Sequence, residues 1–237
     1  MKKDEAEQIK IAQWFNHRYK SIGIKYLRPV VAYELFLTLL QTKEQNKILD
    51  IACGPGQLLL QAKKNNLQCF GIDISEEAIL LCKKRLPDAT VIVANAEQIP
   101  FENNTFNYIS CIGSLERFVN RNTALQEMKR VAKTDATFCF MVRNSNNSSW
   151  KFFKQYFKLQ NKTGHQDAMN LNEWTSLFKQ NNFDIQLITH DHWPLLRWKR
   201  WLSAGLLKID YGKFQSAKKD ITTSNEFIFI LKNASNC

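Results

Sequence analysis

The stretch ILDIACGPGQ, residues 48–57, decides the fold of this chain. Its first five residues place four apolar side chains around one aspartate, and the next four crowd two glycines and a proline into a turn. This pattern predicts a buried strand that ends in a tight loop, after which a helix begins. Because ligands often bind where such loops stand at the carboxyl ends of parallel strands, this loop is the first candidate for a binding site.

Strands and helices alternate through the first half of the chain. Apolar periodicity and capping residues predict helices over residues 4–20, 29–42, 57–66, 76–85 and 121–133. Between them, strands are expected over residues 47–52, 68–73, 90–94, 106–112 and 136–142. The second half is less regular, with a helix expected from its cap Asn172 to Gln180 and strands over 183–190 and 226–231. This alternation implies a parallel sheet with helices on both faces.

Length and composition indicate a single globular domain. A chain of 237 residues suffices for one sizeable core, and 44% hydrophobic with 23% charged residues is ordinary for such a domain. No run of about 18 apolar residues predicts a membrane span, and the start of the chain lacks the apolar core of a secretory signal. The six cysteines include no CxxC pair, so we expect no metal site, no disulfide framework and a cytoplasmic location.

The glycine loop does not fit the dinucleotide fingerprint GxGxxG. Counted from Gly54, the third glycine position holds Leu59, and counted from Ala52 it holds Gln57. A glycine there lets the helix pack close to the strand, so its absence argues against a diphosphate ligand. Asp50 argues the same way, because a carboxylate at the strand end repels a diphosphate and attracts an ammonium or sulfonium group. S-adenosylmethionine carries both of these cations.

Two further segments agree with a nucleoside ligand. Asp73 ends the second expected strand, 17 residues after Gly56, where a carboxylate can accept hydrogen bonds from both ribose hydroxyls. Since NAD-binding proteins share that feature, it does not separate the two ligands. The run Asn95-Ala96-Glu97 at the end of the third expected strand does discriminate between them and favours S-adenosylmethionine.

These segments together resemble the class I S-adenosylmethionine-dependent methyltransferases that act on small molecules. ILDIACGPG (48–56) is similar to the first motif of that family, GIDIS (71–75) to the second, and ANAEQIPFENNTFNYI (94–109) to its adenine-binding segment. IGSLERFVNRNTALQEMKRVAK (112–133) resembles the segment after the fourth strand. The resemblance covers residues 45–145 and implies a Rossmann-like fold with a seven-stranded, mostly parallel sheet whose last strand is antiparallel.

The resemblance also implies which positions contact the cofactor. The backbone from Ala52 to Gly56 would approach the methionyl part, Asp50 its ammonium group, and Asp73 the ribose hydroxyls. The full set of implied contacts is Tyr19, Asp50, Ala52, Cys53, Gly54, Gly56, Asp73, Ile74, Asn95, Ala96, Glu97, Ile112 and Gly113.

Three positions depart from the family pattern. Ala52 replaces a glycine and is tolerable if its φ is negative. Asn95 stands where an aspartate is common, and its side-chain oxygen can still accept a hydrogen bond from adenine. KTDAT (133–137) replaces a turn rich in glycine, so we expect a left-handed conformation at Asp135.

Methyl transfer from a sulfonium needs alignment and exclusion of water, and a base only where the acceptor loses a proton. The candidate bases are Glu116 and His165, for which a solvated helix start and a surface histidine are the alternatives. No [ND]-P-P-[FYW] run follows the fourth expected strand and no Pro-Cys dipeptide occurs, which argues against nucleobase acceptors. The sequence therefore predicts an enzyme acting on an O or N atom of a small or lipid-linked molecule.

Basic charge is concentrated in residues 143–219, which hold 13 Lys+Arg and 5 Asp+Glu, so that +8 of the net +11 lies there. Together with interleaved Trp and Phe, this charge leaves an RNA methyltransferase open as an alternative. A cofactor-binding regulatory protein without an acceptor site is a second alternative.

On a helix, segment 193–214 would separate Leu and Trp from basic side chains. It is either a helix docked on the core or an acceptor-site lid whose Trp and basic residues touch the inner membrane surface or an anionic substrate.

The chain is expected to form one methyltransferase domain over residues 1–237. Its predicted parts are an N-terminal helical cover (1–44), a cofactor-binding core (45–145), and substrate-side insertions with the final strands (146–237). Trp198 and Trp201 are the residues through which the lid hypothesis can be tested.

Overall fold

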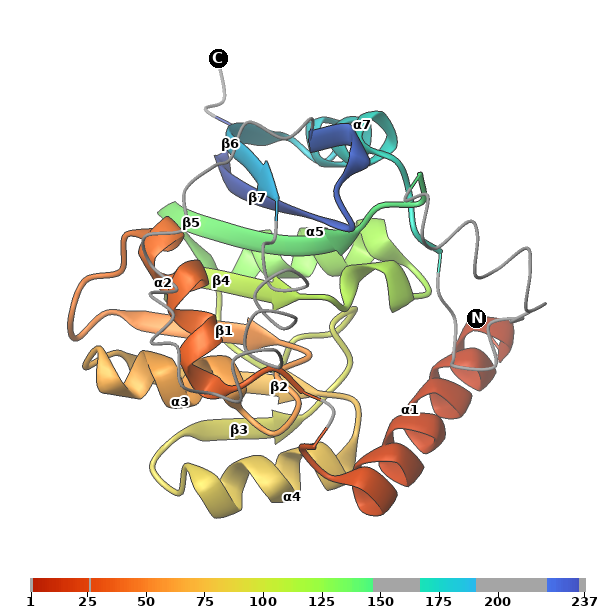
Figure 1. The fold of residues 1–237 in the computed structure, drawn as a ribbon, viewed down its shortest axis with the longest axis vertical. Helices are drawn as coiled ribbons and strands as arrows, with labels where there is room; N and C mark the ends of the chain where they lie inside the picture. The colour runs from red at the N-terminus through yellow and green to blue at the C-terminus, as the bar shows by residue number, and fades with distance from the viewer. Residues whose placement is uncertain (1, 26, 147–166, 191–220, 235–237) are drawn as a thin grey trace, which may run out of the picture.

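The computed structural model describes residues 2–25, 27–146, 167–190 and 221–234 (Figure 1). Its strands are β1 (Lys47–Ile51), β2 (Gln68–Asp73), β3 (Thr90–Val93), β4 (Phe106–Ile112), β5 (Ala132–Arg143), β6 (Phe183–His190) and β7 (Glu226–Asn233). They form one seven-stranded sheet in the order β3-β2-β1-β4-β5-β7-β6. The first five strands pair in parallel, and β7 runs antiparallel to β5 and β6. The predicted sheet with its antiparallel last strand is confirmed.

Helices cover both faces of the sheet. They are α1 (Lys2–Ile22), α2 (Glu34–Leu40), α3 (Gln57–Lys64), α4 (Glu76–Arg85), α5 (Arg121–Val131) and α7 (Leu171–Gln180), with 3-10 turns η1 (Val30–Tyr33), η2 (Leu115–Arg117) and η3 (Ile221–Thr223). Side chains of α2, α3 and α4 form one buried core, and those of α5 and α7 form a second core with the other face. None of the helices in the described ranges combines the length and apolar character that a membrane crossing requires.

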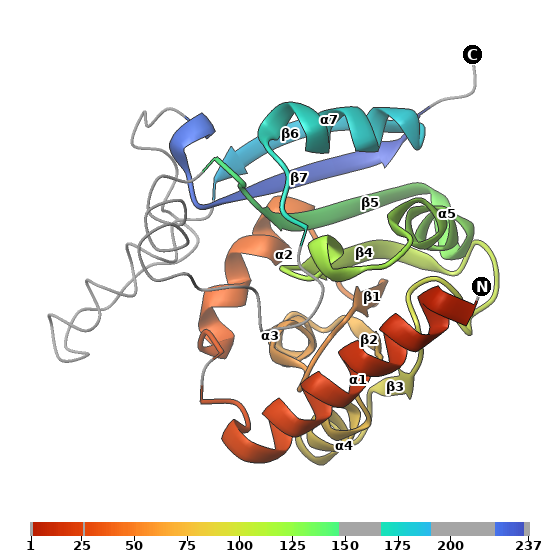
Figure 2. The same ribbon diagram turned by 90° about the vertical axis from the view of Figure 1, so that its right-hand side faces the viewer.

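The N-terminal helix α1 stands apart from these two layers. It lies across the carboxyl ends of the parallel strands and contacts α4 (Figure 2). One tether is Asn16, whose side-chain oxygen accepts a hydrogen bond of 2.6 Å from the Ser75 hydroxyl. Ser75 also caps α4 as predicted, because its hydroxyl oxygen accepts from the Ala78 amide. The N-terminal helix is thereby held over the edge where the glycine loop lies.

Three local predictions differ from the structure. The helix expected over 29–42 is divided into the 3-10 turn η1 and the helix α2. The cap of α7 is Asn170 rather than Asn172, because Asn170 and Glu173 exchange side-chain-to-backbone hydrogen bonds of 2.7 and 3.0 Å. The left-handed conformation expected at Asp135 is wrong, since this residue lies inside β5. The turn expected before the strand is replaced by a change in the register between β4 and β5.

Candidate active site

The loop after β1 is a left-handed turn. Ala52, Gly54 and Gly56 have φ angles of 56°, 54° and 77°. The Cys53 amide donates to the Ile72 carbonyl at 2.9 Å, and the Gly56 amide donates to the Cys53 carbonyl at 3.0 Å. The condition set for an alanine at this position, a negative φ, is therefore not met, and Ala52 costs about 1 kcal/mol relative to glycine. These hydrogen bonds hold the turn in spite of that cost.

Gly54 and Gly56 have no room for a β-carbon. A β-carbon on Gly54 would lie 2.8 Å from the Tyr19 hydroxyl of α1, and one on Gly56 would lie 2.5 Å from Cys82 Sγ of α4. The turn is therefore enclosed between α1 and α4, and both glycines are required by close approach as well as by their positive φ.

Replacement of Gly54 tests the contact between α1 and the turn. Gly54→Ala is expected to lower the free energy of unfolding by about 1–2 kcal/mol, because alanine is strained at positive φ and crowds the Tyr19 hydroxyl. In a Tyr19→Phe background the same change should cost less, because the hydroxyl is gone. Urea unfolding measures both values, and equal costs in the two backgrounds would contradict the contact.

Two buried aspartates lie beside the turn. Asp73 Oδ2 accepts from the Gly54 amide and Oδ1 from the Ser75 amide, both at 2.8 Å. Asp50 Oδ1 accepts from the Ser110 hydroxyl at 2.8 Å. Burial raises the pKa of Asp50 to about 7 and that of Asp73 to about 6, although these hydrogen bonds partly offset the effect. A cation bound nearby would favour the ionised form of both groups.

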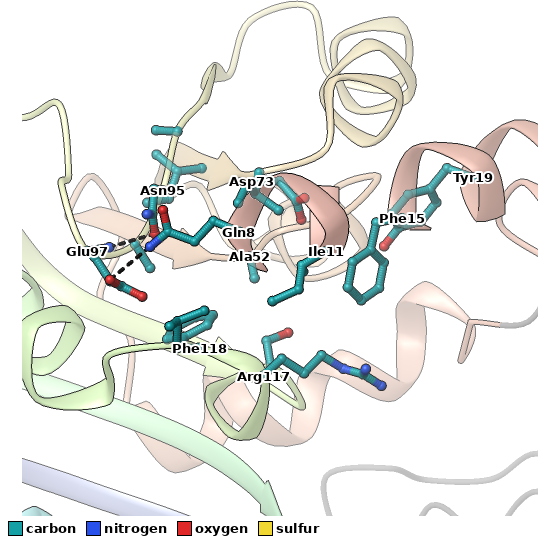
Figure 3. A pocket seen from close by; sticks show the side chains of 16 residues that line it. Gln8, Ile11, Phe15, Tyr19, Ala52, Asp73, Asn95, Glu97, Arg117 and Phe118 are labelled. Atoms are coloured by element: carbon teal, nitrogen blue, oxygen red, sulfur yellow. Dashed lines mark hydrogen bonds between the residues drawn. The ribbon is translucent and has the colours of Figure 1, made fainter. Parts of the chain in front are cut away.

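A cavity with about 620 Å³ of empty space, part of it open to solvent, lies between this turn, the loops after β3 and β4, and α1 (Figure 3). Its lining residues are Gln8, Ile11, Phe15, Tyr19, Ala52, Ile72, Asp73, Ile74, Ala94, Asn95, Ala96, Glu97, Ser114, Arg117, Phe118 and Val119. The cavity is thus built from segments that are far apart in the sequence.

Hydrogen bonds connect the loop after β3 to its neighbours. Glu97 Oε2 accepts from the Gln8 side chain of α1 at 2.9 Å, and Glu97 Oε1 accepts from the Asn120 amide before α5 at 2.9 Å. Asn95 Oδ1 accepts from the Glu97 amide at 3.0 Å, so this oxygen shapes the loop. One further lone pair on the same oxygen remains to contact a ligand.

Charge is divided across the cavity. Arg117 and Phe118 lie across from Asp73 and Asn95 (Figure 3). The Arg117 guanidinium carbon is 5.4 Å from the centre of the Phe15 ring, which also connects η2 to α1. An acidic side that suits hydroxyls and cations therefore faces a side that combines a guanidinium with aromatic rings.

The structure brings seven of the thirteen predicted contacts to the cavity, namely Tyr19, Ala52, Asp73, Ile74, Asn95, Ala96 and Glu97. The other six, Asp50, Cys53, Gly54, Gly56, Ile112 and Gly113, do not line it. Prediction from sequence selected only Tyr19 from α1 and missed Gln8, Ile11 and Phe15. The spacing of these four residues by three or four positions is the signal that could have found them.

The candidate bases are placed differently. Glu116 is fully buried, does not line the cavity, and approaches Arg143 Nε with its Oε1 at 3.4 Å. Among the residues that the structure describes, none donates a hydrogen bond to either of its carboxylate oxygens. Burial raises the pKa of Glu116, and the positive charge of Arg143 opposes that rise. His165 lies outside the described residues.

The described residues include neither an activated Cys53 thiol nor a group of side chains that could hold a metal ion. A hydrogen bond with Cys82 and burial hold the pKa of the Cys53 thiol well above its ordinary value, which makes it a poor nucleophile. Among the described ranges, no three His, Cys, Asp or Glu side chains come together in a way that could hold a metal ion. The cavity can therefore bind and align a ligand with hydroxyl and cationic groups.

Comparisons with known proteins find methyltransferases among the proteins that this chain resembles. Residues 49–140 match the family model described as a methyltransferase domain. An uncharacterized protein of Methanocaldococcus jannaschii is 37% identical over 142 residues, which cover 60% of this chain and 52% of the relative. A ubiquinone/menaquinone biosynthesis C-methyltransferase of Rickettsia typhi is 35% identical over 125 residues, covering 47% of this chain and 50% of the relative. The chain thus spans about half the length of these curated relatives.

A solved structure shares the fold over nearly the whole chain. It is the geranyl diphosphate C-methyltransferase from Streptomyces coelicolor, in complex with Mg²⁺, geranyl diphosphate and S-adenosyl-L-homocysteine. The TM-score is 0.67 with 14% sequence identity, covering 96% of this chain and 98% of that chain. At this identity the likeness concerns the fold alone.

Proposed function

We propose that this chain, whose residues 49–140 match the methyltransferase-domain family model, is a class I S-adenosylmethionine-dependent methyltransferase that transfers a methyl group to an O or N atom of a small or lipid-linked molecule. The observation that carries the proposal is the cavity itself. It brings Asp73, Asn95 and Tyr19 together from three separate segments, under one covering helix. In this proposal, residues 1–44 cover the cofactor, 45–145 bind it, and 146–237 contribute the acceptor side.

The chemistry of the cavity fits the cofactor. The Asp73 carboxylate has about four acceptor sites, and two are taken by backbone amides, so two remain for the ribose hydroxyls. Ile74 and Ala96 offer apolar contacts for adenine, and the ionisable Asp50 and Asp73 favour a cationic ligand. When bound, S-adenosylmethionine supplies a methyl group on a sulfonium, an electrophile that requires no nucleophilic side chain from the protein.

The side of the cavity formed by Arg117 and Phe118 is the proposed acceptor side. There the acceptor atom would bond to the methyl carbon as the carbon–sulfur bond breaks. An O–H or N–H acceptor would also lose a proton to a base. Cover by α1 would exclude water and hold the two reactants in line.

We assign the role of base to Glu116. Its buried carboxylate has an ion pair with Arg143, and no group in the described part of the chain donates a hydrogen bond to it. Such an arrangement costs free energy unless another group donates to the carboxylate. A hydroxyl or amine of the acceptor would be such a donor. Two residues near Glu116 in the chain line the cavity, Ser114 two positions before it and Arg117 directly after it.

Glu116→Gln is expected to lower turnover about 100-fold while the affinity for S-adenosylhomocysteine stays unchanged, because the amide cannot take up a proton. Single-turnover rates and calorimetry measure the two quantities separately. In the wild-type protein, turnover should rise with pH through the raised pKa of Glu116, and this rise should be missing in the variant. Full turnover in Glu116→Gln would reduce Glu116 to a structural ion-pair partner.

A carbon acceptor is the second candidate. It is favoured by the Rickettsia relative, 35% identical over 125 residues, which is named a C-methyltransferase. The RNA alternative depends on the basic third of the chain. Residues 147–166 and 191–220 of that third, with His165, Trp198 and Trp201, lie outside the described residues. A cytoplasmic enzyme with peripheral membrane contact through segment 193–214 remains part of the proposal.

Incubation with labelled S-adenosylmethionine and fractionated cell extract separates these functions. We expect label in the small-molecule or lipid fraction, with release of S-adenosylhomocysteine. Label in RNA would support the RNA alternative. Cofactor binding with no product in any fraction would support the regulatory protein. Trp198→Ala with Trp201→Ala, assayed for turnover and liposome binding, tests the lid and the membrane contact separately.

A further inference from the structure

A chain of hydrogen bonds connects the glycine turn to α4 and to the segment before η1. The guanidinium of Arg85, in the last turn of α4, donates to the Pro55 carbonyl at 2.6 Å and to Gln57 Oε1 at 2.5 Å. The Gln57 amide nitrogen in turn donates to the Arg28 carbonyl at 2.9 Å. None of these four residues lines the cavity, so the chain of bonds supports the turn from outside it.

Burial makes these bonds important for the shape of the turn. Gln57 is 6% exposed, so its amide has little access to water and depends on protein partners. Burial lowers the pKa of Arg85, but the group stays charged, and hydrogen bonds from a charged donor are stronger than neutral ones. The Pro55 carbonyl lies between Gly54 and Gly56, whose left-handed conformations set the direction of the turn.

Arg28 extends the connection to the strands β5 and β7. Its Nη2 is 3.3 Å from Met141 Sδ of β5 and 3.5 Å from Glu226 Oε2 at the start of β7. The Arg28 side chain is only 9% exposed. The segment that accepts from Gln57 is thereby held against β5 and β7 as well.

We propose that Arg85 and Gln57 are positioning residues, which act through the Pro55 carbonyl and the Arg28 carbonyl to hold the glycine turn in its cofactor-binding conformation. The inference rests on the proposed function, because the turn must bind S-adenosylmethionine. Neither residue touches the ligand in this proposal. Their loss should weaken cofactor binding more than it weakens the fold.

The test compares Arg85→Met with a matched control, Lys129→Met. Lys129 also donates to two loop carbonyls, those of Asn181 and Asn182 after α7, and neither of these residues lines the cavity. Calorimetry with S-adenosylhomocysteine should show a loss of affinity of about tenfold or more in Arg85→Met and none in Lys129→Met, at similar shifts of the thermal midpoint. Arg85→Lys retains one donor and should recover part of the loss.

Gln57→Met provides a second and independent variant. It should also weaken binding, and the double variant with Arg85→Met should lose less than the product of the two single losses, since both act on one chain of bonds. Unchanged affinity in both single variants would overturn the inference, as would equal losses in Arg85→Met and Lys129→Met. Failure of the wild-type protein to bind S-adenosylhomocysteine would instead overturn the proposed function.

Discussion

Asp73→Ala is expected to reduce the affinity for S-adenosylhomocysteine about 1000-fold. The change would remove both proposed acceptors for the ribose hydroxyls, each worth roughly 1.5–3 kcal/mol for a charged partner. It also leaves the Gly54 and Ser75 amides without the carboxylate to which they donate at 2.8 Å, which loosens the turn itself. Calorimetry at constant pH measures the loss.

Two variants make this result specific to the carboxylate. Asp73→Asn keeps one acceptor oxygen but presents an amide donor to the second backbone N–H, so its loss should be intermediate. Asp88→Ala removes an acid that is 77% exposed and lies on the surface beside Lys63, so binding should be unchanged. Wild-type affinity in Asp73→Ala would show that this carboxylate is only a support for the turn.

The free energy of unfolding of the ligand-free protein is expected to fall as the pH rises from 4 to 8. Burial raises the pKa of Asp50 from 3.8 to about 7, so the native state holds a proton that the unfolded chain releases at lower pH. The stabilisation linked to this proton is fully present below the unfolded pKa and is lost as the pH rises through 7. The difference between the two pKa values corresponds to about 4 kcal/mol. Asp73, with a pKa of about 6, acts in the same direction.

Asp50→Asn isolates this contribution from the other titrating groups. The asparagine oxygen can still accept from the Ser110 hydroxyl, so the packing is retained while the ionisation is removed. Urea unfolding at several pH values should show a smaller decrease in the variant than in the wild-type protein. The affinity for S-adenosylhomocysteine should rise more steeply up to about pH 7 in the wild-type protein than in the variant, where Asp73 is the remaining carboxylate that ionises near the ligand ammonium. Parallel pH curves for the two proteins would contradict the prediction.

Elements with a strong local signal were predictable. The bounds expected for β2, β4 and β6 agree with the structure, because an apolar run between turn residues defines a strand without reference to distant residues. The Ser75 cap of α4 was found for the same reason, since a capping side chain bonds to an amide only three residues away. The cap of α7 was misplaced by two residues, because Asn170 and Asn172 are both residues that can cap a helix.

Site residues at the strand ends were predictable, because the position of a residue along a parallel strand determines whether it lies at the edge of the sheet that holds the cavity. Asp73 and the run from Asn95 to Glu97 line the cavity, because parallel strands bring their carboxyl ends to one edge. Asp50 also lies near the carboxyl end of its strand, but its carboxylate accepts from the Ser110 hydroxyl and does not line the cavity. The direction of a side chain at a strand end depends on its neighbours in space.

By itself the sequence determined the alternation of strands and helices, the tight glycine turn after the first strand and the acids at the ends of two strands, because local sterics and periodicity govern these features. Only the tertiary structure decided the positive φ of Ala52, the face that α1 presents to the cavity, and the burial that raises the pKa values of Asp50 and Glu116. Each of these depends on contacts between residues far apart in the chain. Such contacts leave no local pattern, because many different partners could satisfy the same residue.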